Sequence, residues 1–141
     1  MTGTSLHRAM GTLAAMAATG LAQPAAARDP SAGAAEYQLS CAVCHGTRGR
    51  GNGPMAKGLS KAPTDLTKLE ERNDYQFPYL KVFQIIDGRA VVPDHGTREM
   101  PVWGRRYLED VGDSRGPYGS EAAVRARIEE LVRYVQSLQE R

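Results

Sequence analysis

The stretch CAVCHGTRGRG, residues 41–51, contains both cysteines of this 141-residue chain. Two residues separate Cys41 from Cys44, and His45 follows the second cysteine directly. Closely spaced cysteines serve three chemistries in proteins: a redox dithiol, half of a zinc site, or covalent attachment of haem. The sequence on either side of this stretch helps to decide among the three.

The N-terminal residues predict an exported protein. Arg8 is the only Lys or Arg before position 28, and the uncharged run AMGTLAAMAATGLAQPAAA separates it from Arg28. A basic start, an apolar middle and a small-residue end are typical of a secretory signal peptide. We therefore expect residues 1–27 to be removed by cleavage after Ala27, or alternatively after Ala26.

The remaining residues, 28–141, are expected to form one domain of nearly neutral charge. Of 18 basic residues one, Arg8, lies in the signal segment, so 17 basic residues face 16 acidic ones, a formal charge of +1. No basic block with interleaved aromatic residues is present, and we expect no nucleic-acid partner. An uncleaved membrane anchor is the alternative interpretation of the N-terminus, but Pro24 and many alanines suit a membrane span poorly. We expect a monomer without stable membrane insertion.

The predicted export of the protein helps to choose among the possible roles of the cysteine motif. Cysteines of exported proteins meet an oxidising environment, yet a disulfide between Cys41 and Cys44 would close a very small loop and add little stability. Zinc would need two further ligands, and the other histidines, His7 and His95, lie in the signal segment and far downstream. A thioredoxin-like dithiol needs neighbouring strands, which the flanking residues do not predict. C-x-x-C-H in an exported chain instead indicates c-type haem attachment.

The spacing of the motif suits a porphyrin. Two intervening residues let one turn of chain bring both sulfurs to the same edge of the macrocycle, where each can add across a vinyl group. His45 then lies under the iron and can offer its imidazole as the proximal ligand. Its other ring nitrogen needs an acceptor that fixes the ring. We predict one haem c, attached to Cys41 and Cys44 and ligated by His45.

The sixth position of a His-ligated haem iron is either open or closed by a donor such as Met or His. Met55 lies only ten residues after His45, too close for the chain to round the porphyrin edge. Met100 lies 55 residues after His45, and Pro101 restricts the backbone that follows it. We predict Met100 as the axial ligand, with His95 and, more remotely, a lysine as alternatives.

Two short helices are predicted before and after the middle of the chain. The first covers residues 31–41, SAGAAEYQLSC, with Ser31 as a possible N-cap. The second covers residues 77–87, FPYLKVFQIID, with Pro78 in its first turn. Gly88 follows it and is a typical C-terminal stop.

The clearest helix is predicted over residues 120–140, where apolar residues step by four and three positions along one face. This face contains Val124, Ile128, Leu131, Val135 and Leu138. We expect Ser120 to cap the helix. On its outer side Glu129 and Arg133 form a favourable i,i+4 pair.

The rest of the domain is predicted to be loop. The loop segments are 46–69, 88–106 and 109–119, and Gly104 is expected to permit a turn. So much irregular chain is unusual in a compact domain. A large cofactor accounts for it, because loops can wrap a haem and cover its faces.

With C-x-x-C-H, a later methionine and helices at both ends, the sequence resembles the class I monohaem cytochromes c. The resemblance covers nearly all of residues 28–141. It implies an all-α fold in which three to four short helices and long loops wrap one covalently bound haem. In this family the terminal helices cross through a glycine and an aromatic residue on one side and a leucine and an aromatic residue on the other. The matching residues here are Gly33, Tyr37, Leu131 and Tyr134.

The resemblance also implies two further haem-binding residues. The family places a proline between the haem motif and the second helix, and the carbonyl of that proline accepts the Nδ1 proton of the ligating histidine. Pro63 matches this role, with Pro54 as its competitor. The stretch MPVWG, residues 100–104, looks like the Met loop of bacterial members and adds Trp103 to the expected haem contacts.

The expected function is that of a periplasmic electron carrier, not an enzyme. An iron closed by His and Met binds no substrate, so the haem would exchange electrons with a transient donor and a transient acceptor, both redox proteins. One alternative is a haem enzyme or gas-binding cytochrome with a labile sixth ligand. Another is a cytochrome c subunit of a larger redox complex. Residues 91–99 and 109–119 look like additions to the family pattern and are expected to be solvated loops.

Overall fold

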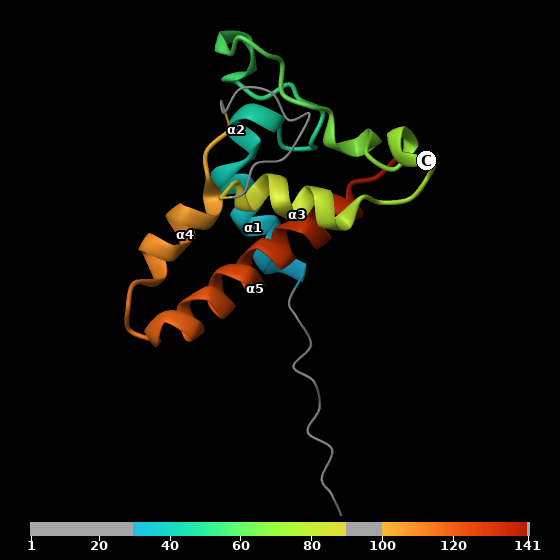
Figure 1. Ribbon diagram of the computed structural model, residues 1–141. Coiled ribbons are helices and arrows are strands. Elements are labelled where there is room, and N and C mark those ends of the chain that lie inside the picture. The colour runs from blue at the N-terminus through green and yellow to red at the C-terminus, as the bar shows by residue number, and fades with distance from the viewer. Residues whose placement is uncertain (1–29, 90–99, 141) are drawn as a thin grey trace, which may run out of the picture.

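The computed structural model describes residues 30–89 and 100–140 of the chain (Figure 1). These residues form helices and no strands, which confirms the predicted all-α class. The α-helices are α1 (Pro30–Ser40), α2 (Ala42–His45), α3 (Tyr79–Asp87), α4 (Trp103–Val111) and α5 (Gly116–Ser137). Three short 3-10 helices are η1 (Ala56–Gly58), η2 (Leu66–Lys68) and η3 (Glu71–Asn73).

Three features predicted from the sequence lie outside the described residues. They are the signal segment 1–27, the segment 91–99 and the alternative ligand His95. Among the helices that the structure does describe, none is both long and apolar enough to cross a membrane.

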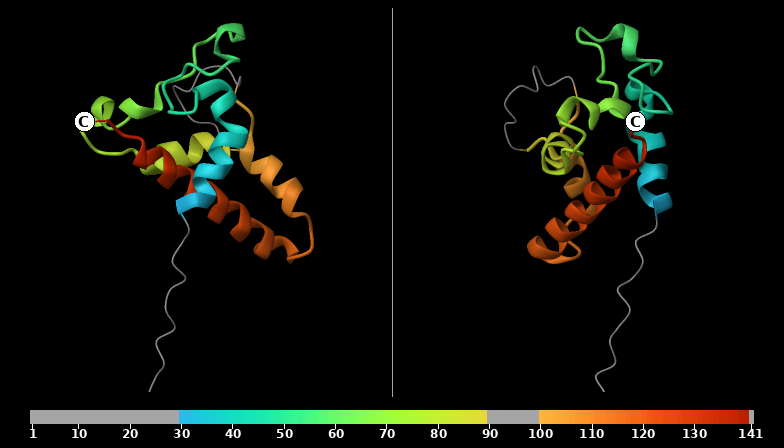
Figure 2. Two further views of the ribbon diagram at one scale, coloured as in Figure 1. Left: turned by 180° about the vertical axis from the view of Figure 1, so that it is seen from behind. Right: turned by 90° about the vertical axis from the view of Figure 1, so that its right-hand side faces the viewer.

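The two terminal helices cross as predicted (Figure 2). A Cβ atom on Gly33 of α1 would lie 2.2 Å from the carbonyl oxygen of Glu130 in α5, so only glycine permits this approach. The rings of Tyr37 and Tyr134 meet beside it, with centroids 5.0 Å apart and planes tilted by 48°. Tyr37 and Leu131 are fully buried at the crossing. The crossing therefore places the start of the haem motif, which follows α1, against the second half of α5.

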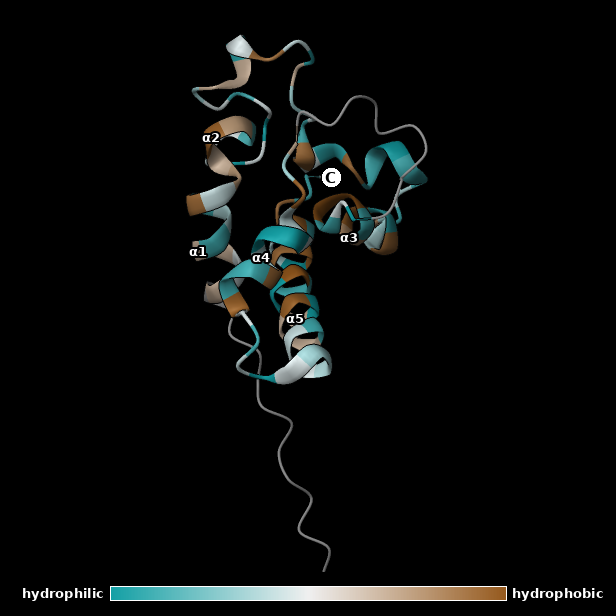
Figure 3. Cartoon of the chain, turned by 60° about the vertical axis from the view of Figure 1, so that its left-hand side comes forward, coloured by the Kyte–Doolittle hydropathy of each residue, from teal (hydrophilic) through white to brown (hydrophobic). Residues whose placement is uncertain are grey.

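The apolar face of α5 forms much of the core. Figure 3 shows apolar positions recurring between polar ones along this helix. Four of the five residues predicted for this face are buried, and the fifth, Leu138, packs against them while partly exposed. On the polar side Arg133 donates to Glu129 at 3.1 Å, which confirms the predicted pair.

The predicted stop of α3 is confirmed, whereas the predicted start of α5 is wrong. Gly88 has a φ of 64°, the left-handed conformation expected after a helix, and its N–H bonds to Gln84. The last helix begins at Gly116, with Pro117 in its first turn, four residues before the predicted Ser120. Ser120 is buried inside the helix, and its hydroxyl donates to the carbonyl of Gly112 at 2.7 Å.

Helix α4 was predicted to be loop, and this is the largest error in the predicted fold. Its buried face is narrow: Trp103 and Tyr107, four residues apart, are buried, while the residues between them are mostly polar. Gly104 forms no turn but lies inside the helix. A Cβ on Gly104 would come within 2.9 Å of the carbonyl oxygen of Asp87 and closer still to its side chain. Glycine thus lets α4 approach the end of α3.

A polar cluster joins α1, α4 and α5. Arg127 donates to Glu36 through two nitrogens at 3.0 and 2.8 Å and to Asp110 at 2.9 Å. Its guanidinium lies 3.9 Å from the ring centre of Tyr107, whose hydroxyl donates to Glu36 at 3.0 Å. Burial alone would raise the pKa of Glu36, but the hydrogen bonds from Ser40, Arg127 and Tyr107 outweigh burial and lower it. The carboxylate is therefore held in its charged form.

Candidate functional site

The cysteine motif forms a single helical turn at the end of α1 and in α2. The N–H groups of Cys44 and His45 both bond to the carbonyl of Cys41, at 3.1 and 2.9 Å. The glycine-rich chain that follows folds back over this turn. Gly51 donates to the carbonyl of His45 at 2.8 Å, and Gly53 donates to that of Cys44 at 3.0 Å. The backbone of the motif is thus fixed by residues close to it in sequence.

No disulfide joins Cys41 and Cys44, so both sulfurs are available for another bond. Cys41 is buried and Cys44 is partly exposed. Burial, with smaller contributions from Glu36 and Cys44, raises the pKa of the Cys41 thiol to about 12. This thiol is therefore neutral at pH 7.

The second nitrogen of His45 has an acceptor, but it is not the one predicted. The carbonyl oxygen of Thr64 lies 3.1 Å from Nδ1 of His45, one residue beyond the predicted Pro63. The carbonyl of Pro63 faces Gly51, where an added Cβ would come within 2.3 Å of it. The acceptor position that the resemblance gave to Pro63 is thus held by Thr64 in this structure, while the carbonyl of Pro63 lies against the glycine-rich loop.

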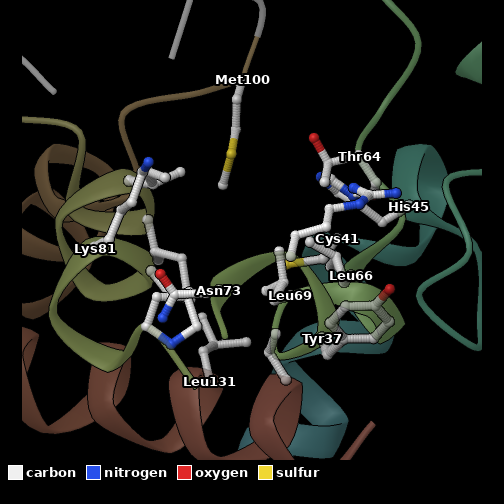
Figure 4. A pocket seen from close by; sticks show the side chains of 16 residues that line it. Tyr37, Cys41, His45, Thr64, Leu66, Leu69, Asn73, Lys81, Met100 and Leu131 are labelled. Atoms are coloured by element: carbon white, nitrogen blue, oxygen red, sulfur yellow. Dashed lines mark hydrogen bonds between the residues drawn. The ribbon is translucent and has the colours of Figure 1, made fainter. Parts of the chain in front are cut away.

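A cavity of about 310 Å³ opens beside the motif. Most of its lining is apolar and comes from the end of α1, the segment 64–78, α3, Met100 and α5. The apolar lining residues include Tyr37, Leu66, Leu69, Val82, Ile85, Ile86, Leu131 and Val135. Cys41 and His45 stand in the wall of the cavity, and Arg72, Asn73 and Lys81 add polar groups. In Figure 4, Lys81 and Asn73 lie across the pocket from His45.

The structure separates the predicted sixth-ligand candidates. Met100 is half-buried and lines the cavity, and Figure 4 shows its sulfur extending into the space between Lys81 and His45. Met55 is 56% exposed and is not among the lining residues. Of the methionines in the described residues, Met100 is thus the one placed to meet a group in the pocket.

Trp103 lies elsewhere than predicted. It is buried in the core at the start of α4, with its ring 5.7 Å from that of Tyr107, and it is not among the lining residues. The Met loop expected over MPVWG ends early because Trp103 is the first residue of a helix. The side chain therefore anchors α4 to the core instead of contacting the pocket.

The donor set in this pocket suits a haem. Cys41, Cys44 and His45 lie within one helical turn, Cys41 and His45 line the pocket together with the Met100 thioether, and most of the remaining lining is apolar. A bare metal ion is a poorer match, since residues 30–89 and 100–140 contain no group of three or more His, Cys, Asp or Glu side chains able to hold one.

A family model for cytochrome c matches residues 30–139. The chain belongs to the cytochrome c family. Searches of curated proteins and of solved structures each found no match. Family membership means that this cytochrome holds an iron-containing haem c covalently, and Cys41 and Cys44 with His45 supply the required C-x-x-C-H motif. The family transfers electrons, so the coarse functional class predicted from the sequence is confirmed.

Sequence reasoning missed most of the pocket wall of this cytochrome. Thr64, Leu66 and Leu69 come from a segment that was predicted only as loop, and Arg72 was not singled out. One local signal was available: Asp65 caps η2 by accepting from the N–H of Thr67 at 2.9 Å. Short 3-10 turns leave no long apolar period, so the pattern that revealed α5 could not reveal these residues.

Proposed function

We propose that this cytochrome is a periplasmic electron carrier whose single haem iron is closed by His45 and Met100. The observation that supports this assignment is that the Met100 sulfur extends into the same pocket that His45 lines (Figure 4). The haem supplies an Fe(III)/Fe(II) couple. A thioether ligand favours Fe(II) and so raises the reduction potential relative to a second histidine.

The protein residues tune that couple. An Nδ1–H of His45 donates to Thr64, which fixes the imidazole plane and raises its basicity as a ligand. The apolar wall limits water and lowers the local dielectric, which disfavours the more highly charged oxidised state. Arg72 and Lys81, at the pocket wall, supply positive charge that can balance the two carboxylates of a haem.

Periplasmic location is supported by the signal-peptide pattern of residues 1–27. An exported carrier of this size would act as a monomer between a redox donor and a redox acceptor that dock transiently. Electrons would pass through the haem without substrate binding at iron, which distinguishes a carrier from a haem enzyme or a gas-binding cytochrome.

Carbon monoxide binding to the reduced protein at neutral pH tests this proposal. We expect no uptake by the wild type or by Met55→Ala, and rapid uptake by Met100→Ala, because only the last variant opens the sixth site. Rapid uptake by the wild type would instead favour a haem enzyme or gas sensor. The mass of the native protein and its cell fraction test the location: a membrane-bound protein that retains residues 1–27 contradicts it.

A further inference from the structure

The C-terminus of the chain is tied to the segment that forms one wall of the pocket. The side-chain amide of Gln139 donates to the carbonyl of Leu66 at 2.7 Å and accepts from the N–H of Glu70 at 3.0 Å. It also donates to Val135 at 2.8 Å, which anchors the amide to the end of α5. One side chain thus bridges two backbone groups that lie 73 and 69 residues earlier in the sequence.

Glu140 adds two further ties. Its backbone N–H donates to the carbonyl of Thr67 at 2.9 Å. Its carboxylate pairs with Arg50 at 2.5 Å, and Arg50 belongs to the glycine-rich loop that covers the haem motif. We call Gln139 and Glu140 the C-terminal clamp.

The segment that the clamp holds, residues 64–70, contains the acceptor near His45 and part of the pocket wall. It begins with the Thr64 carbonyl, which lies 3.1 Å from the His45 Nδ1, and continues through Leu66 and Leu69 of the pocket wall. Other bonds also hold this segment: Asp65 caps Thr67, and the N–H of Leu66 donates to Gly49 in the glycine-rich loop. The clamp holds three further backbone groups of the same segment, at Leu66, Thr67 and Glu70.

We propose that Gln139 and Glu140 are positioning residues that hold the Thr64 carbonyl against His45 and so fix the imidazole that ligates the iron. The inference rests on the proposed role of His45 as a ligand. Because the clamp bonds to backbone groups inside η2 and directly after it, releasing the clamp frees the segment as a unit. The carbonyl of Thr64, two residues before the first clamped group, then moves away from Nδ1 more often.

The direct test is the exchange rate of the His45 Nδ1 proton in the reduced haem-loaded protein, measured by NMR. Gln139→Leu keeps the side-chain volume and removes all three amide bonds. We expect exchange to accelerate about tenfold, which corresponds to about 1.4 kcal/mol of opening free energy. Gln136→Leu is the matched control, because Gln136 is an exposed glutamine in the last turn of α5, three residues before Gln139, and we expect it to leave the rate within about twofold of wild type.

A second control separates positioning from general stability. Ile128→Val removes one methyl from a fully buried site on α5 and lowers global stability by about 1 kcal/mol. If the Nδ1 proton exchanges no faster in Gln139→Leu than in Ile128→Val at the same unfolding free energy, the clamp contributes only to global stability and the proposal is wrong.

A second test uses the wild-type protein and needs no variant. Native-state hydrogen exchange should show one common opening for the His45 Nδ1 proton and the N–H groups of Glu70 and Glu140, below the opening free energy of the α5 core. A His45 proton that opens separately from Glu70 and Glu140 contradicts the proposal. A wild-type spectrum without histidine ligation would overturn the proposed function itself, so the two failures are distinguishable.

Discussion

The two halves of α5 differ in what they contact. The second half crosses α1 at Gly33 and contributes Leu131 and Val135 to the pocket wall. The first half is tied to the ends of α3 and α4, through the pair between Arg89 and Glu121 and through buried Ser120. Contacts of the second half therefore set the shape of the haem site, whereas contacts of the first half support the scaffold away from it. We therefore expect substitutions at contacts of the second half to change both stability and the haem spectrum, and substitutions at contacts of the first half to change stability alone.

Gly33→Ala should have the largest effect. The added Cβ meets backbone atoms of Glu130 that cannot turn away, so the helices must separate. Alanine gains up to about 1 kcal/mol of helix propensity. Overpacking at the crossing costs about 3 kcal/mol, which exceeds the gain in helix propensity, so the variant should be less stable than the wild type. Guanidinium unfolding followed by circular dichroism measures the loss, and the haem spectrum should change with it.

Gly58→Ala is the matched control for this prediction. Gly58 has open space around it, so an added methyl should leave the unfolding midpoint unchanged. Equal midpoints for Gly33→Ala and the wild type would show that close approach at the crossing does not stabilise the fold.

A pair of buried tyrosines gives a finer comparison. The hydroxyl of Tyr37 donates to Gly46, directly after His45, at 2.7 Å, and that of Tyr107 donates to Glu36 at 3.0 Å. Each change to Phe removes one hydrogen bond from an acceptor that keeps another donor, Gly49 at Gly46 or Ser40 and Arg127 at Glu36, and should cost about 1 kcal/mol. Only Tyr37→Phe should shift the NMR resonances of the haem methyl groups. Shifts of similar size in Tyr107→Phe would contradict the claim that only contacts near the haem motif shape the haem site.

The smallest predicted effect is a pH dependence from Glu36 of α1, which pairs with Arg127 of α5 and accepts from Tyr107 of α4. Its pKa is lowered in the folded protein relative to an ordinary value of 4.5, because hydrogen bonds to Ser40, Arg127 and Tyr107 outweigh burial. The folded state then binds fewer protons than the unfolded state at acid pH. The carboxylate contributes stability above pH 4.5 that is lost as the pH falls through the folded pKa.

Urea unfolding between neutral and acid pH measures this contribution. Wild-type stability should fall more steeply below pH 4.5 than that of Glu36→Gln, which is less stable at neutral pH and lacks the titrating group. Parallel pH profiles for the two proteins would contradict the assignment.

The sequence predicted the parts of this cytochrome that depend on short spacing. The haem motif and the apolar face of α5 were readable from residues three or four positions apart, and the pairing of Gly33 and Tyr37 with Leu131 and Tyr134 was implied by the resemblance to the class I cytochromes c. The fold confirms the helix face and the crossing. Such local periods determine which side of a helix is buried before any partner is known.

The errors lie where partners distant in the sequence decide the structure. Helix α4 has only Trp103 and Tyr107 as its large buried side chains, and its place depends on the polar cluster around Arg127. The carbonyl near Nδ1 of His45 belongs to Thr64 and not to Pro63, whose carbonyl lies against the loop at Gly51. Neither fact has a local signature, since each depends on which backbone approaches from elsewhere.

The near-infrared charge-transfer band from sulfur to ferric iron tests the central claim most directly. A haem closed by His45 and Met100 should show this band in the oxidised wild type and in Met55→Ala. Met100→Ala and Met100→His should both lose it, and the reduction potential should fall in both, within the roughly 0.8 V range over which axial ligands set haem potentials. A wild-type protein without the band, or a band that survives without Met100, would contradict the assignment of a closed electron carrier.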